Sequence, residues 1–110
     1  MINATVWNNG QHRRSGAGYG LKISSADRDR HFRREWRTVQ LRIGAAIPIV
    51  ANVDKPSFWN DSCRELISAQ LGRWMLANQL APWPSGQPPR FSLVPREPAV
   101  FEISIPALNA

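Results

Sequence analysis

The sequence predicts a small α+β domain: a mostly antiparallel pseudobarrel or curved sheet of six to seven strands with two helices. Its 110 residues suffice for one domain (1–110) with one modest core, and are too few for two. Nine prolines and seven glycines disfavour an all-helical bundle, because each interrupts helices or marks turns. Hydrophobic residues make up 43% of the chain, and five of its ten aromatic residues are tryptophan, so the chain carries enough apolar surface to fold.

Period-two alternation or β-branched composition predicts four strands in the first half of the chain. They are residues 3–8, 19–23, 36–43 and 47–53. The first ends at Asn8-Asn9-Gly10, which tolerate positive φ and favour a turn. The clearest alternation is that of Val39, Leu41 and Ile43, which we expect to face the core.

Two helices are expected. Ser24 or Ser25 can cap a short helix that ends near Arg34. The second helix is longer, because apolar residues recur at three- and four-residue steps from Cys63 to Asn78 and residues 62–65 fit a capping box.

The end of the chain predicts a connector and two further strands. Prolines within residues 82–89 make a rigid, extended connector. Residues 90–94 and 100–105 then form a terminal strand pair. The predicted order is strand, strand, helix, strand, strand, helix, strand, strand.

The net charge of +6 is concentrated in one part of the sequence. Residues 11–42 hold nine basic and three acidic side chains, whereas the remainder is balanced. Twelve of the fourteen bases are arginine, whose planar donors match phosphate oxygens and guanine edges, so nucleic acid is the leading expected partner. The alternative is an interaction module whose Arg-rich face docks an acidic protein, with Trp59 or Trp83 as an exposed hot spot.

Several function classes are disfavoured. Cys63 is the single cysteine, so no intrachain disulfide is expected, and the first residues lack a signal-peptide pattern, which indicates a cytoplasmic protein. The apolar stretch 43–53 is about half the length that a bilayer span requires, so no membrane partner is expected. The glycine-rich segment 16–20 opens a strand rather than a helix, and no Walker lysine follows it, which disfavours phosphate-loop nucleotide binding.

Neither a catalytic centre nor a cofactor is expected. His12, His31 and Cys63 lack the spacing of zinc ligands, and Cys63 is expected to be buried on a helix face rather than to act as a nucleophile.

A metal-dependent nuclease is the least favoured alternative. Asp27, Asp29 and Glu35 could together bind Mg²⁺ for phosphodiester cleavage. Helix-start electrostatics and local pairing with Arg28 and Arg30 explain these acids more simply, so no metal site is predicted.

The basic polar arm after the first strand, residues 8–16, carries the strongest functional signal. Asparagine and glutamine side chains pair with adenine, and arginine pairs with guanine. Serine side chains and backbone amides hold phosphates. The candidate base contacts are Asn9, Gln11, His12, Arg13 and Arg14, and Lys22, Arg33 and Arg37 join the two arginines as candidate phosphate contacts. Lys55 and Asn60 belong to a second polar cluster, which either forms another DNA-contacting arm or only caps the following helix.

Short segments over most of the chain share one family pattern. They are the first strand with its polar arm, Gly20-Leu21-Lys22-Ile23-Ser24, His31-Phe32, Val39-Gln40-Leu41, Phe58-Trp59-Asn60-Asp61-Ser62, Trp74 with Asn78 and Leu80, and the closing strand. In this order they resemble the plant B3 and restriction-enzyme effector family of DNA-binding pseudobarrels.

That resemblance implies a seven-stranded pseudobarrel whose two non-catalytic arms enter the major groove. By the same resemblance, the loop residues from Asn9 to Arg14 lie on the first arm with Lys22 beside it, and Lys55, Ser57, Asn60 and Arg64 lie on or near the second. The chain departs from the family in its longer second helix, its proline-rich connector and its six predicted strands. We therefore expect a double-stranded DNA-binding module whose log affinity falls with log salt at a slope of about −4 to −5.

Overall fold

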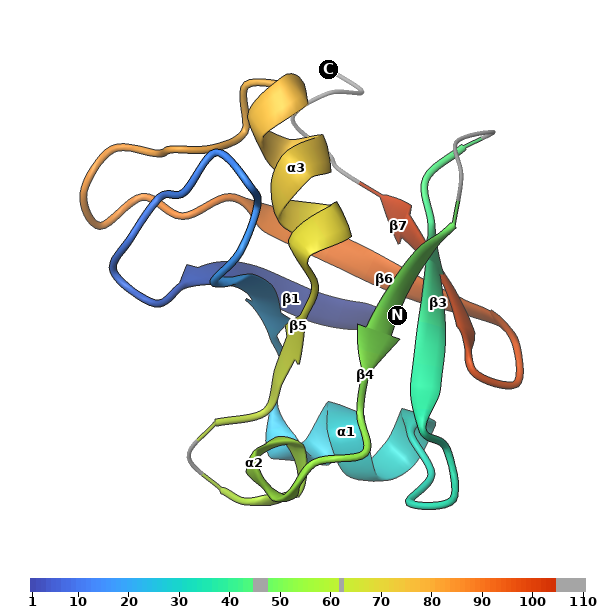
Figure 1. Ribbon diagram of the computed structural model, residues 1–110. Coiled ribbons are helices and arrows are strands. Elements are labelled where there is room, and N and C mark those ends of the chain that lie inside the picture. Colours follow the sequence, from blue (N-terminus) through green and yellow to red (C-terminus); the bar gives the residue numbers. More distant parts are fainter. Residues whose placement is uncertain (45–47, 62, 105–110) are drawn as a thin grey trace.

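Seven strands close into a barrel in the computed structural model, which describes residues 1–44, 48–61 and 63–104 (Figure 1). The strands are β1 (Ile2–Asn8), β2 (Tyr19–Lys22), β3 (Thr38–Arg42), β4 (Ile49–Asn52), β5 (Glu65–Ile67), β6 (Arg90–Glu97) and β7 (Val100–Ser104). The described residues also form three helices: α1 (Ser25–His31), α2 (Pro56–Trp59) and α3 (Ala69–Ala77). The protein is thus a small α+β fold.

Hydrogen bonds run round the barrel in the order β1-β2-β5-β4-β3-β7-β6, and β6 pairs back onto β1. Most described neighbours are antiparallel, as predicted, but β3 and β7 are parallel, with Leu41 opposite Phe101. The sheet is therefore mixed. Closure leaves no free sheet edge along this ring of strands, which removes the sites where sheets aggregate.

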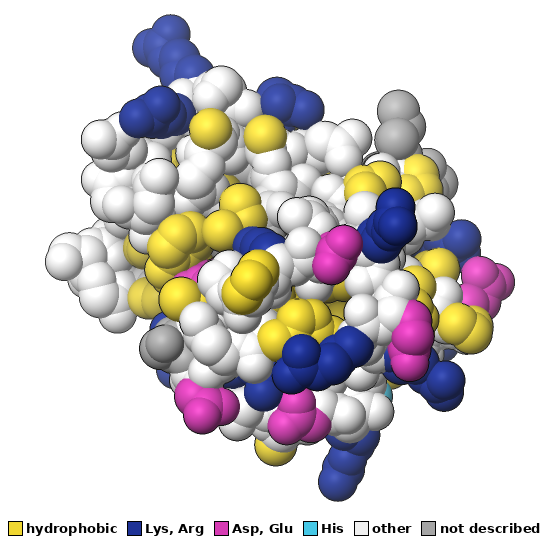
Figure 2. Space-filling view, turned by 60° about the horizontal axis from the view of Figure 1, so that its bottom comes forward, with side chains coloured by type: hydrophobic (Ala, Val, Ile, Leu, Met, Phe, Trp, Pro, Cys, Tyr) yellow, Lys and Arg dark blue, Asp and Glu magenta, His cyan; other side chains and the backbone are white. Residues whose placement is uncertain are grey.

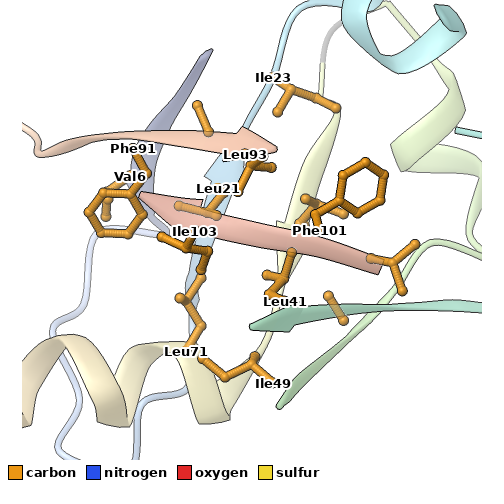
Figure 3. Packing of buried hydrophobic residues seen from close by; sticks show 14 of the residues in the cluster. Val6, Leu21, Ile23, Leu41, Ile49, Leu71, Phe91, Leu93, Phe101 and Ile103 are labelled. Atoms are coloured by element: carbon orange, nitrogen blue, oxygen red, sulfur yellow. The ribbon is translucent and has the colours of Figure 1, made fainter. Parts of the chain in front are cut away.

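Alternate residues of the strands fill the barrel (Figure 3). In β3, Val39 and Leu41 are buried, as their alternation predicts, while Ile43 beyond the strand is half-buried. Leu71 enters from α3 and lies near Ile49 and Ile103 in Figure 3. At full burial such aliphatic side chains each contribute about 1.5–3 kcal/mol, so this interior supplies the main stabilisation of the fold.

Helices cover the two ends of the barrel (Figure 1). At one end, the buried Arg28 of α1 donates from Nη1 to the backbone oxygens of Phe58 (3.1 Å) and Asn60 (2.6 Å), which joins α1 to the α2 segment. Ser24 caps α1 by accepting from the Asp27 amide, as predicted. The helix ends at His31 rather than near Arg34. At the other end, α3 packs against the loop between β1 and β2.

The helix predicted from Cys63 to Asn78 is confirmed only over its second part, α3, and is wrong before Ala69. Residues 65–67 form strand β5, and α3 begins only at Ala69, with the Ser68 hydroxyl accepting from the Leu71 amide. Arg64 has a φ of +65°, which no helix residue adopts, and Leu66 pairs with Leu21 of β2. The observed order, ββαββαβαββ, therefore has one strand and one short helix more than the predicted ββαββαββ.

The other predicted strands are confirmed, with changed ends. The strand predicted at 90–94 extends to Glu97, with a register irregularity between Pro95 and Glu97. Residues 47 and 105 of the predicted strands, and residue 62 of the predicted capping box, lie outside the described residues. No helix in the described part of the chain has the length and hydropathy needed to cross a bilayer.

Candidate functional site

The loop between β1 and β2, residues 9–18, is hereafter the arm. Hydrogen bonds to asparagine side chains set the conformation of the first half of the arm. The Gly10 amide donates to Asn8 Oδ1 (2.8 Å), and the Gln11 amide donates to Asn9 Oδ1 (3.1 Å). In each of these two turns, the side-chain oxygen of an asparagine accepts the hydrogen bond that a backbone carbonyl accepts in an ordinary turn. Asn9 Oδ1 therefore accepts a hydrogen bond within the arm and helps to shape it.

His12 attaches the arm to the barrel. His12 Nδ1 lies 2.6 Å from Tyr19 Oη, and the His12 ring meets the Trp83 ring edge-on, with centroids 4.9 Å apart. Burial raises the pKa of Tyr19, which favours the protonated form of its hydroxyl. His12, predicted as a DNA contact, is thus mainly an anchor of the arm, although its side chain remains exposed.

Two glycines make the second anchor. Gly16 of the arm lies directly on Gly72 of α3, where a Cβ added to Gly72 would be only 2.7 Å from Gly16 Cα. Arg73 of α3 donates from Nη1 to the Ser15 carbonyl oxygen (3.1 Å). The arm therefore rests on a helix that follows it by more than fifty residues in the sequence.

Arg13 and Arg14 project from this anchored loop and are exposed. Gln11 Oε1 accepts from Arg13 Nε (2.8 Å) and also from Arg13 Nη2. These two bonds turn the Nε and Nη2 atoms of Arg13 toward Gln11 and leave Nη1 for a ligand. Within residues 1–44, 48–61 and 63–104, neither arginine takes part in an ion pair.

The segments that form this end of the barrel contain no acidic residue. Residues 8–18 and 68–90 carry Arg13, Arg14, Arg73 and Arg90, and no Asp or Glu. We call these segments the arm end. Arg73 and Arg90 were not predicted as site residues. Only the packing of α3 against the arm brings Arg73 near it, and Arg90 begins β6, which pairs with β1. The adjacent Gly72 and Arg73 in this helix were the local signal in the sequence.

The opposite end, around α1 and α2, mixes both charges. It holds three of the other predicted contacts, Arg33, Arg37 and Asn60, and all three are exposed. Figure 2, turned so that this end comes forward, shows acidic side chains among the basic ones. The acidic residues of these segments are Asp27, Asp29, Glu35, Asp54 and Asp61. The structure therefore divides the predicted residues between two ends instead of gathering them on one surface.

Lys22 belongs to the second group and not beside the arm, as the resemblance implied. It ends β2 at the side away from the arm, opposite Glu65 of β5. The half-buried Lys55 is also close enough to Glu65 to feel its charge. Burial lowers the pKa of Lys55, while Glu65 and Cys63 act in the opposite direction. Two of the chain's lysines thus flank one buried carboxylate.

The arm and the α2 segment leave opposite ends of the paired strands β2 and β5. Because β2 has four residues, about 13 Å of strand separates these two loops. The outer face between them carries Trp7, Gly20 and Ile67, which lie in register on three neighbouring strands. Two polar loops thus border one short, flat strip of sheet.

Among the described residues, no three His, Cys, Asp or Glu side chains are grouped as metal ligands. Asp29 instead pairs with Arg28 (3.0 Å), and Cys63 is half-buried in the loop before β5 rather than on a helix. Trp59 and Trp83, the predicted hot spots, are each partly buried against the core. No protein-family model, curated protein or solved structure matches the chain.

Proposed function

We propose that the chain is a non-catalytic double-stranded DNA-binding module that contacts the major groove with its arm. One observation carries the proposal: exposed, unpaired arginines stand on an anchored loop whose surroundings in the chain lack acidic residues. Positive charge without nearby carboxylates attracts phosphates and is not neutralised before DNA arrives.

The anchoring favours recognition over mere attraction. A loop already held by His12, Gly16 and the asparagine turns pays little ordering entropy on binding. The arm joins two antiparallel strands, and the major groove, about 12 Å wide, admits a two-stranded ribbon. Arg13, oriented by Gln11, is suited to the O6 and N7 acceptors of guanine, while Arg14 and Arg73 are suited to phosphates.

The predicted contacts at the opposite end of the barrel have a supporting role in DNA binding. Lys22, Lys55 and Asn60 border the far side of the β2–β5 strip and would meet the duplex backbone there, with Arg33 and Arg37 beyond them. The seven strands and the position of the arm after the first strand agree with what the B3 resemblance implies, and they support keeping that resemblance within the proposal. The mixed charge of this end makes its contribution to affinity the smaller one.

The test is duplex binding by fluorescence anisotropy across a salt series. Four arginines at the arm end predict a log–log salt slope of about −3 to −4, shallower than the sequence alone suggests. The variant R13A/R14A should lose at least about tenfold in affinity and about one unit of slope, because Arg14 contacts a phosphate and Arg13 a base edge. The matched control R34A/R42A removes the same charge away from the arm and should lose far less.

Two outcomes would overturn the proposal. One is an unchanged affinity and slope in R13A/R14A, which would clear the arm of any role. The other is absence of a salt-dependent duplex complex together with capture of an acidic protein by the wild-type chain. Single-stranded DNA and RNA of the same sequence serve as competitors, and equal competition would remove the assignment to duplex DNA.

A further inference from the structure

A cavity of about 460 Å³ lies at the barrel end opposite the arm, between the last turn of α1 and the β6–β7 turn. Its volume falls within the range of small-molecule sites, roughly 300–1,000 Å³. The lining residues are Arg30, His31, Arg33, Trp36, Pro95, Arg96, Glu97, Pro98 and Phe101. None of them belongs to the arm or to the β2–β5 strip.

The walls of this cavity are predominantly basic. Arg30 and Arg33 are exposed, and neither forms an ion pair within the described residues. Arg96 donates to Glu102 (2.8 Å), outside the lining. The single lining carboxylate, Glu97, lies 3.9 Å from the Arg42 guanidinium, which offsets its charge. Two free guanidinium groups at one opening are suited to an anionic group such as a phosphate.

The floor of the cavity is aromatic. Trp36 is half-buried, and its ring meets those of Phe32 and Phe101 edge-on, with centroids 6.2 Å and 6.4 Å away. These contacts fix the indole ring. Pro95 and Pro98 add rigid apolar surface on the β6–β7 side. A fixed indole beside proline rings is suited to a flat, unsaturated ring.

We propose that this cavity binds a small aromatic phosphate of the nucleoside monophosphate class. The ring stacks on Trp36, and the phosphate accepts from Arg30 and Arg33. The site is separate from the glycine-rich segment 16–20 and from the arm, which lies at the opposite end of the barrel. Arg33 is the one lining residue that also has a supporting role in the proposed DNA contact, and mononucleotide binding does not require the arm.

The test is equilibrium binding of AMP, GMP, CMP and UMP to the intact chain by calorimetry, with ribose 5-phosphate and inorganic phosphate as ring-free probes. Adjacent arginines give a matched pair of variants. R33A should weaken mononucleotide binding by about tenfold or more, because it removes a hydrogen bond to a charged group. R34A removes the same charge, but Arg34 lies over the Trp59 ring, outside the cavity, and should change binding less than about twofold.

Backbone amide spectra locate the bound nucleotide. AMP should shift signals of residues 30–36 and 95–101 and leave those of residues 9–18 unchanged. Equal weakening by R33A and R34A, inorganic phosphate binding as tightly as AMP, or no saturation by about 10 mM would each overturn the proposal. The variant W36F, which keeps an aromatic ring against Phe101, should fold and weaken AMP more than ribose 5-phosphate.

Discussion

A methyl group added at Gly72 would test whether the arm is anchored by its packing on α3. In an exposed helix, replacing glycine with alanine stabilises by about 1 kcal/mol. At Gly72 the new Cβ would lie 2.7 Å from both Cα and the carbonyl carbon of Gly16, closer than atoms tolerate. Both neighbours are backbone atoms, so the arm must lift from α3.

The two effects give the expected magnitude. Overpacking costs about 1–3 kcal/mol, which exceeds the gain in helix propensity. We expect G72A to lose about 1 kcal/mol of unfolding free energy, or roughly 4–8 °C in Tm for a small domain. An arm released from α3 must be ordered again on binding, at about 0.5–1.5 kcal/mol per side chain, so duplex affinity should fall by about tenfold.

Thermal unfolding, anisotropy and amide spectra of the arm residues measure these effects. The control is G44A: Gly44 has a φ of +55° and nothing within 4 Å of an added Cβ, and it lies far from the arm in the sequence. Alanine there should also cost about 1 kcal/mol, through its left-handed conformation, but leave duplex affinity unchanged. If G72A were stabilised by about 1 kcal/mol with wild-type affinity, the packing of Gly16 on Gly72 would be refuted.

Three further predictions concern single side chains. S68A should lose about 1 kcal/mol of unfolding free energy in urea, because Ser68 caps α3, and no loss would contradict the start of α3 at Ala69. The raised pKa of Tyr19 means that the native chain keeps a proton which the unfolded chain releases near pH 10; stability should therefore hold below about pH 10 and fall above it. Ultraviolet titration of this single tyrosine checks the direction, and a midpoint below that of free tyrosine would contradict it. After reductive ¹³C-methylation, the signal of Lys55 should titrate below the ordinary pH range of a lysine side chain; a midpoint at or above that range would contradict the burial of Lys55.

Local patterns were sufficient for much of the fold. Alternation over Val39 and Leu41 located β3, and a serine before an acidic turn located α1. Such signals are reliable because one residue's environment is decided by neighbours two to four positions away. Strand β5 was missed for the opposite reason. Its three residues are too few for alternation, and their strand conformation depends on pairing with β2, more than forty residues earlier.

In the candidate site too, features set by local sequence were predicted and features set by distant contacts were not. The arm was predicted from its own composition, and its position after β1 was correct. The charge of the surface around it was not predicted, because folding brings together residues that are distant in the sequence. Arg34 lies beside Asp54, whereas the arm gains Arg73 from α3. The roles of Asn9 and His12 also required coordinates, since their partners are made by folding.

The position of β7 between β3 and β6 has a consequence for how the protein is made. β7 supplies the parallel pairing that completes the ring, and β6 supplies the pairing with β1, so both gaps are filled by residues 90–104. During synthesis, strands β1 to β5 emerge first and must wait with the edges of β1 and β3 uncovered. Chaperone dependence of the nascent chain should accordingly be greatest just before its last fifteen described residues leave the ribosome.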